Sequence, residues 1–357
     1  MKTGKLAEPV WRRSVCRQLH MEFSGENGHY GADCTQMCGP APSASVGPLP
    51  GFAHAPEKQV MAAANRLAAC GAELETLAVH AALPAGCEEA AFQSDLRRIA
   101  SAAAQYEAQA QDVCAYVTPA VSQPQYFVTG FGRMDDGAKK CEHESGAEEG
   151  CAGEGCGSMK KDSVRSREEH AAVQSVLRPG QELVVTKWIA LGGTAALALR
   201  CGEELRTRYP FSLVDRAAAF ENVLDVRTEA KSAYALGDCA IHCMGEGGVF
   251  CALWEMAERA GTGLDLDLKK IPIRQESVEL CEYFDINPYC LYSEGALLIG
   301  TDHAELLVAS LAAQGIAAAV IGRVTKGRER VIRNGEDCRY LERPQQEEWY
   351  RRMTWQS

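Results

Sequence analysis

Three glycines directly precede an apolar helical stripe in the second half of the chain, and no other stretch of the sequence is better suited to chemistry. The glycines are Gly245, Gly247 and Gly248. Because the first N–H groups of a helix have no partner within the helix, and because the helix dipole favours negative charge, this turn could bind an anion. His242 and Glu246 flank it and are the candidate catalytic residues. The alternative interpretation is a glycine-rich strand-to-helix turn that serves packing alone.

A second group of potential ligands lies between residues 133 and 170, where Cys141, His143, Cys151 and Cys156 occur. Thiolates and imidazole are good metal ligands. No close C-x-x-C pair preorganises a tetrahedral site, however, so we favour the alternative of a mobile loop with incidental thiols and leave any metal unassigned. The segment has almost no large apolar side chain. Since it cannot bury enough surface to fold alone, we interpret it as a flexible insertion between two domains.

The elements that must position these groups begin with an α+β pattern in the first half. Apolar residues at helical spacing predict helices over 57–70 and 87–108. Apolar, β-branched runs predict strands over 74–83, 112–118 and 125–131. Helices and strands therefore alternate here around one predicted sheet.

The second half predicts a mixed sheet with covering helices. The expected elements are a strand over 183–189, a helix over 194–205, a helix over 249–260, a strand over 264–268, a strand over 296–300, a helix that ends at Gln314 and a strand over 316–324. The Asn334-Gly335 dipeptide predicts the turn of a final hairpin, because both residues tolerate positive φ. A β-α-β order followed by a hairpin predicts both parallel and antiparallel pairing.

Length and composition fit an ordinary globular protein of two domains. The chain has 357 residues, of which 46% are hydrophobic. We predict an N-terminal domain over 1–132, the flexible insertion over 133–170, a C-terminal domain over 171–344 and a tail over 345–357. The fold class is therefore α+β.

Charge and hydropathy exclude several classes of partner. The formal net charge of -11 disfavours nucleic acid, whose phosphates require a basic surface. The first 16 residues contain no signal-peptide core, and the longest apolar run, Trp188–Leu199, is too short to span a membrane. The 16 cysteines are scattered rather than arranged as a disulfide framework. We expect a cytoplasmic protein with reduced thiols that acts on a small molecule or a protein.

Several separated motifs carry a family resemblance. They are M-K-T-G-K-L at 1–6, A-A-N-R-L-A-A-C-G-A at 63–72, V-T-P-A-V-S-Q-P at 117–124, T-K-W-I-A-L-G-G-T at 186–194, H-C-M-G-E-G-G-V-F-C-A-L-W-E-M-A at 242–257, K-I-P-I-R-Q-E at 270–276 and I-G-R-V-T at 321–325. In this order they resemble the AIR synthase (PurM-like) superfamily, in particular AIR synthase-related proteins of the HypE type. The likeness is nearly continuous from about 183 to 344 and weaker in the first half.

The resemblance implies a PurM-like architecture with an N-terminal dimerisation domain and a C-terminal mixed-sheet domain. It further implies a homodimer whose N-terminal domains share a sheet and that holds ATP in a cleft between domains and subunits. Such enzymes use ATP to phosphorylate an amide or similar oxygen, and acidic side chains hold the Mg²⁺ that neutralises the phosphates. Carried onto this sequence, the resemblance makes Asp33, Asn65 and Lys187 cofactor-binding candidates, together with the glycine turn.

The sequence departs from the family pattern at several polar positions. Cys243 and Gly245 stand where the family pattern H-D-x-T-E-G-G has aspartate and threonine. Asn65 is followed by Arg66 where the family has aspartate, and Q-D-V-C-A-Y at 111–116 replaces G-G-H-T-E. An arginine at a carboxylate position repels Mg²⁺, although it could contact a phosphate directly.

Three functions are therefore weighed. We favour a dimeric anion- or partner-binding paralogue with an impaired ATP site, in a maturation or metabolic pathway, because several presumed metal-ligand positions have changed together. The alternative is an ATP-dependent enzyme that activates an amide or carboxylate oxygen. The third is thiol or metal sensing through the insertion. HypE-type proteins have a C-terminal cysteine that receives a carbamoyl group, but Cys338, the last cysteine here, falls within the predicted hairpin.

Overall fold

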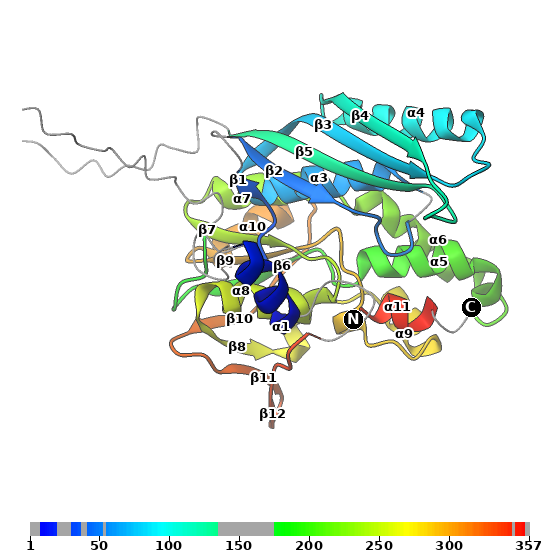
Figure 1. The fold of residues 1–357 in the computed structure, drawn as a ribbon. Coiled ribbons are helices and arrows are strands. Elements are labelled where there is room, and N and C mark those ends of the chain that lie inside the picture. Colours follow the sequence, from blue (N-terminus) through cyan, green and yellow to red (C-terminus); the bar gives the residue numbers. More distant parts are fainter. Residues whose placement is uncertain are drawn as a thin grey trace, which may run out of the picture.

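The computed structural model shows two sheets with helices packed between and around them (Figure 1). It describes residues 8–19, 30–36, 41–52, 55–134, 175–344 and 347–353. Most of the predicted insertion, including Cys141, His143, Cys151 and Cys156, lies outside the described residues.

The first sheet has five strands in the order β1-β2-β5-β3-β4. Their bounds are β1 Thr35–Gln36, β2 Pro42–Val46, β3 Ala72–Leu83, β4 Gln109–Val117 and β5 Gln125–Met134. Strands β3 and β4 pair in parallel, and the other neighbours are antiparallel. Helices α3 (Glu57–Ala69) and α4 (Glu89–Gln105) pack on one face. Because β5 continues through Met134, the strand includes the first two residues that the sequence assigns to the insertion.

The second sheet has seven strands in the order β12-β11-β8-β10-β6-β9-β7. Their bounds are β6 Glu182–Thr186, β7 Cys239–Cys243, β8 Gly263–Asp267, β9 Leu297–Thr301, β10 Ala318–Thr325, β11 Arg330–Asn334 and β12 Asp337–Tyr340. Only β8 and β11 pair in parallel within it. Mixed pairing and the α+β class thus follow the sequence expectation.

Helices cover this sheet and fill the space toward the first one. The longer ones are α5 Leu191–Arg206, α6 Phe211–Ala219, α7 Arg227–Tyr234, α8 Gly248–Ala260, α9 Gln275–Tyr283 and α10 Ala304–Ala313. The remaining helical segments within the described residues are α1 Glu8–Trp11, a π-helix at Arg12–Cys16, α2 Arg17–Leu19, α11 Glu348–Met353 and three 3₁₀ turns at Phe220–Val223, Leu268–Lys270 and Pro288–Cys290. None of the helices in the described residues is long and apolar enough to cross a membrane.

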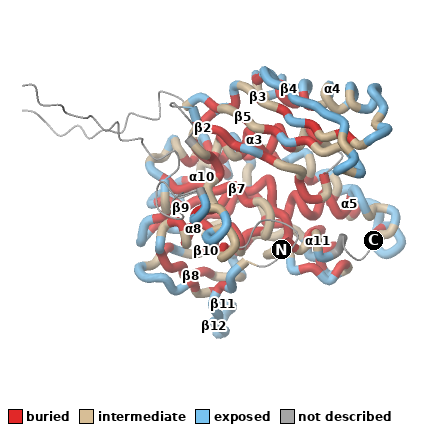
Figure 2. The backbone as a smooth tube through the Cα atoms, in the orientation of Figure 1, coloured by how far each residue is buried: buried red, intermediate tan, exposed pale blue. Residues whose placement is uncertain are grey.

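The two halves share a continuous core, which appears as the buried segments at the centre of Figure 2. Helix α3 connects them, since it packs on β2, β3 and β5 of the first sheet and also on α7 and β7 of the second half. Its Val60, Ala64 and Leu67 are fully or almost fully buried, as their helical spacing predicts. Any polar side chain on α3 that faces the second half therefore lies between the sheets.

Two predicted bounds differ from the structure for a backbone reason. The strand expected over 183–189 ends at Thr186, because Lys187 and Ala190 adopt left-handed φ angles of 51° and 62°. The following helix starts at Leu191, earlier than predicted. Between them the chain turns sharply, and this turn brings Lys187 to face the segment between α6 and α7.

Candidate functional site

A buried imidazole lies between two carboxylates at the junction of the two halves. Nδ1 of His242, on β7, is 2.9 Å from Oδ2 of Asp33, and Nε2 is 3.2 Å from Oε2 of Glu255 on α8. The same Oδ2 of Asp33 accepts a hydrogen bond from the backbone N–H of Cys243 at 3.1 Å. All three residues of this triad are at least nine-tenths buried. Two sequence candidates, Asp33 and His242, are thus brought together.

The two carboxylates determine the charge of this imidazole. Burial opposes a charge on His242, but Asp33 and Glu255 outweigh burial and raise its pKa to about 9. At neutral pH the ring is therefore protonated and both of its N–H groups donate. An imidazolium that is held in this way is a structural counter-ion and a poor proton acceptor. The arrangement gives His242 little capacity for general-base chemistry in this state.

Asn65 lies in a second buried cluster on α3. Its Nδ2 donates to the carbonyl of Leu224 and to Oε1 of Glu294, both at 2.8 Å, and its Oδ1 accepts from the N–H of Val226 at 3.1 Å. These bonds use the hydrogen-bonding capacity of the amide almost fully. Asn65 therefore connects α3 to two loops of the second half.

Arg66, which replaces an aspartate of the family pattern, lies next to these carboxylates. Its Nη1 donates to the carbonyl of Ser45 at 2.8 Å. Burial lowers the pKa of its guanidinium, but Glu294 and Asp33 outweigh burial and raise it. A fixed positive charge thus stands beside Asp33, and it opposes the approach of a cation to that carboxylate.

The ammonium group of Lys187 is bound by neighbouring residues of the second half. Its Nζ is 2.6 Å from Oε1 of Glu229 on α7 and donates to the carbonyls of Val223 and Asp225 at 2.9 and 2.5 Å. Two backbone carbonyls accept hydrogen bonds from the ammonium group, and the carboxylate of Glu229 compensates its charge. The structure thus gives Lys187 a partner on α7, at a distance in sequence that no local pattern reveals.

The glycine turn has the backbone geometry that its composition predicts. Gly247 and Gly248 have left-handed φ angles of 80° and 64°. A Cβ on Gly248 would lie 2.6 Å from the carbonyl oxygen of Tyr289, so the close approach of the 289–291 segment requires glycine. The carbonyl of Gly245 accepts from the N–H groups of Gly248 and Ser293. The N–H of Gly247 points away from these bonds and donates to a carboxylate oxygen of Glu347.

The described residues do not supply a ready magnesium site. Among them, no group of three or more histidine, cysteine, aspartate or glutamate side chains is arranged to hold a metal ion. Asp33 already binds His242 and the N–H of Cys243, and Arg66 lies nearby. In this arrangement the donor set does not fit Mg²⁺, which requires several free oxygen ligands.

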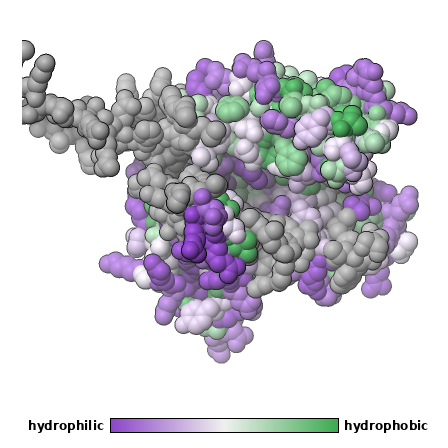
Figure 3. Space-filling view, viewed as in Figure 1, coloured by the Kyte–Doolittle hydropathy of each residue, from purple (hydrophilic) through white to green (hydrophobic). Residues whose placement is uncertain are grey.

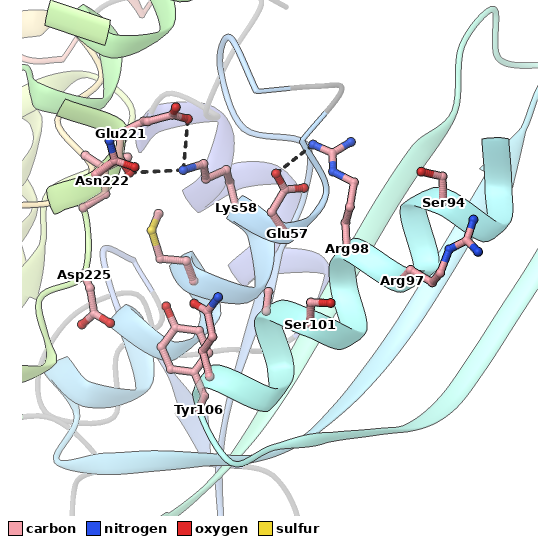
Figure 4. Close-up of a pocket in the computed structure, with 14 residues that line it drawn as sticks. Glu57, Lys58, Ser94, Arg97, Arg98, Ser101, Tyr106, Glu221, Asn222 and Asp225 are labelled. Carbon is pink, nitrogen blue, oxygen red and sulfur yellow. Dashed lines mark hydrogen bonds and ion pairs between the residues drawn. The ribbon is translucent and has the colours of Figure 1, made fainter. Parts of the chain in front are cut away.

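A cavity of about 650 Å³ separates α3 and α4 from the 221–225 segment. Figure 4 shows their side chains facing one another across it. Nζ of Lys58 is 3.3 Å from Oε2 of Glu221, and Nη2 of Arg98 is 2.8 Å from Oε1 of Glu57. Its size is typical of small-molecule sites. None of the sequence candidates lines this cavity, because it forms only where the two halves meet and no local motif marks it.

The second half of the chain matches a known family and curated relatives. Residues 178–334 match the AIR synthase related protein, C-terminal domain. The chain is 34% identical over 152 residues to carbamoyl dehydratase HypE of Rhodobacter capsulatus, covering 41% of this chain and 42% of HypE. It is 26% identical over 170 residues to phosphoribosylformylglycinamidine synthase subunit PurL of Methanopyrus kandleri, covering 45% of this chain and 22% of PurL. The chain thus matches less than half the length of these relatives.

Solved structures share the fold over nearly the whole chain. HypE in a HypE–HypF complex has a TM-score of 0.63 and 17% identity, covering 87% of this chain and 93% of HypE. HypE in complex with ATP has a TM-score of 0.60 and 15% identity, covering 97% of both chains. Thiamine monophosphate kinase from Aquifex aeolicus has a TM-score of 0.59 and 13% identity, covering 94% of this chain and 99% of the kinase. Residues 178–334 thus match the AIR synthase-related C-terminal domain and the HypE relatives, and the chain as a whole has the fold of the solved HypE structures.

Proposed function

We propose that this chain is a dimeric HypE-like protein that binds an anionic group at the glycine turn and has lost most nucleotide turnover. The buried ion pair between Asp33 and His242 is the observation that carries the proposal. A carboxylate that neutralises an imidazolium is not available to a metal ion unless that pair opens, and opening leaves a buried charge uncompensated. The glycine turn, in contrast, has the left-handed φ angles at Gly247 and Gly248 that its glycines permit, which supports the proposal.

The proposed dimer uses the open face of the first sheet. Tyr116 on β4 and Phe127 on β5 are 56% and 49% exposed, and they lie on the face opposite α3 and α4. Figure 3 shows apolar side chains gathered over this sheet. Large exposed apolar patches mark protein interfaces. Pairing two copies through this face would bury it and place two glycine turns in one assembly.

Parallel measurements of ligand binding and turnover test the proposal. Titration calorimetry with inorganic phosphate should give saturable binding, and hydrogen exchange should slow in the 243–251 peptide when phosphate is bound. Under the same conditions ATP hydrolysis with Mg²⁺ should stay far below about 1 s⁻¹, the lower end of ordinary enzyme turnover. Hydrolysis within the ordinary range, or phosphate binding that leaves this peptide unchanged, would refute the proposal.

The second candidate is an ATP-dependent enzyme that activates an amide or carboxylate oxygen. The cavity between the two halves favours it, because its walls carry the cations Lys58, Arg97 and Arg98, which suit phosphates. HypE with a similar fold has been solved in complex with ATP. If this function is correct, the chain should turn over Mg·ATP with a suitable acceptor, and Glu246→Gln, with Glu336→Gln as an exposed control, should abolish that turnover.

A further inference from the structure

The C-terminal segment 347–353 places a buried carboxyl group in the glycine turn. The side chain of Glu347 is only 2% exposed. Its Oε2 accepts from the N–H of Gly247. Its Oε1 accepts from the N–H of Tyr292 at 2.8 Å and from that of Trp349 at 3.2 Å. Both oxygens are therefore held by backbone donors, two of which belong to segments far away in the sequence.

These donors form a site with a defined chemical preference. The left-handed Gly247 directs its N–H toward the carboxyl group, and helix α8, which starts at the next residue, adds the positive end of its dipole. The N–H of Tyr292 approaches from the loop between α9 and β9. Backbone N–H groups that are arranged in this way bind a small oxyanion, either a carboxylate or a phosphate oxygen.

The segment is also anchored by apolar contacts, because Tyr350 packs against the core and Trp349 is buried in it. Trp349 is 2% exposed, and its ring packs so closely on Gly51 that a Cβ there would lie 2.8 Å from it. The half-exposed Arg351 of α11 pairs with Glu348 and with the exposed Asp285. Surface pairs of this kind contribute little to stability. Docking of the segment therefore depends mainly on Glu347 and on the apolar contacts of Trp349 and Tyr350.

Burial disfavours the charged form of the Glu347 carboxyl group. It raises the pKa of Glu347 to about 8, although the three backbone N–H groups act in the opposite direction. An external anion whose charge suits these donors better could accept hydrogen bonds from the same N–H groups. The Glu347 side chain would then be exposed to water. The segment lies outside the sheets, so it could leave without breaking a strand pairing.

We propose that segment 347–353 is an intrachain ligand of the glycine turn, and that the turn binds either Glu347 or an external oxyanion, but not both. The inference rests on the anion-binding function proposed above and adds its regulation. The occupied state is then self-inhibited, and any partner that holds the segment away from the turn would raise the affinity for the anion.

Phosphate binding by the full chain and by three variants tests the inference. Glu347→Ala removes the competing carboxyl group, and Trp349→Ala removes the buried indole ring while keeping that group. Glu348→Ala is the matched control, because Glu348 directly follows Glu347 in the chain but contacts Arg351 instead of the turn. Calorimetry gives the affinity for inorganic phosphate, with acetate as a second probe, and hydrogen exchange reports on residues 347–353. Circular dichroism confirms that each variant is folded.

When Glu347 occupies the turn, only the fraction of molecules with an empty turn can bind phosphate, and the apparent affinity is reduced by that fraction. Both test variants should therefore bind phosphate about tenfold or more tightly than the parent and the control. Phosphate should also speed exchange of residues 347–353 in the parent. Equal affinities in all four proteins with no change in exchange would overturn the inference and leave anion binding intact. Absence of phosphate binding even in Glu347→Ala would overturn both. Competition by acetate as well as phosphate would extend the ligand class to carboxylates.

Discussion

The imidazole Nδ1 of His242 lies 2.9 Å from Oδ2 of Asp33, although 209 positions separate the two residues. Asp33 belongs to the loop before β1, and His242 belongs to β7 at the edge of the other sheet. The pair therefore joins the two halves of the molecule as a buried ion pair. Its energetic role leads to the first two predictions.

Replacing His242 by glutamine should strongly destabilise the protein. The variant keeps a polar side chain but removes the positive charge between Asp33 and Glu255. Breaking a buried ion pair costs about 3–5 kcal/mol because it leaves a buried charge uncompensated. Urea unfolding should show this loss in the free energy of unfolding. His303→Gln, at an exposed position, should change it by less than about 0.5 kcal/mol, and a similarly small change for His242→Gln would contradict a structural role for the pair.

The same pair should make stability depend on pH in an alkaline window. The pKa of His242 is raised from 6.5 to about 9 in the folded state, so its contribution is complete below pH 6.5 and is lost as the pH rises through 9. Within this window the free energy of unfolding should fall by at most about 1.4 kcal/mol per pH unit. Unfolding curves from pH 6 to 10 measure the slope. The difference between the parent and His242→Gln isolates this residue, and parallel profiles would disprove the assignment.

Lys187→Met should be more harmful than the loss of both members of its ion pair. The single change leaves the carboxylate of Glu229 buried without its cation, which costs about 3–5 kcal/mol. The double variant Lys187→Met, Glu229→Leu removes the stranded charge and should recover much of that loss. A double-mutant cycle from urea unfolding measures the coupling energy. A coupling near zero would mean that the ammonium group is available to a ligand after all.

Charges on the open sheet face should separate the proposed dimer. Tyr116→Glu combined with Phe127→Glu places two carboxylates in the interface, where desolvation and like-charge repulsion oppose association. Light scattering after size exclusion should show the parent as a dimer and the variant as a monomer. Phe211→Glu, which changes a more exposed phenylalanine on α6, should stay dimeric. A monomeric parent, or dissociation by Phe211→Glu instead, would exclude this face.

The sequence predicts elements well wherever the signal is local. The stripe of α8 and the glycines before it fix the turn, and the Asn334-Gly335 turn fixes the last hairpin. What it cannot reveal are pairings made by tertiary contact. Nothing near Lys187 marks Glu229 as its partner, and nothing in the polar tail distinguishes Glu347 from its neighbour Glu348. The cavity between α4 and residues 221–225 is likewise invisible, because each wall alone reads as an ordinary solvated surface.

The way in which Glu347 is held has a consequence for time scales. When its carboxyl group leaves, the N–H groups of Gly247 and Tyr292 lose their acceptors, and Tyr292 is buried with little access to water. Opening without a replacement is therefore slow, and an incoming oxyanion or water molecule that takes over these donors lowers the barrier. The replacement of Glu347 by an external anion should then have a relaxation rate that increases with the concentration of that anion. A rate that is independent of that concentration would instead indicate that the segment first swings free by itself.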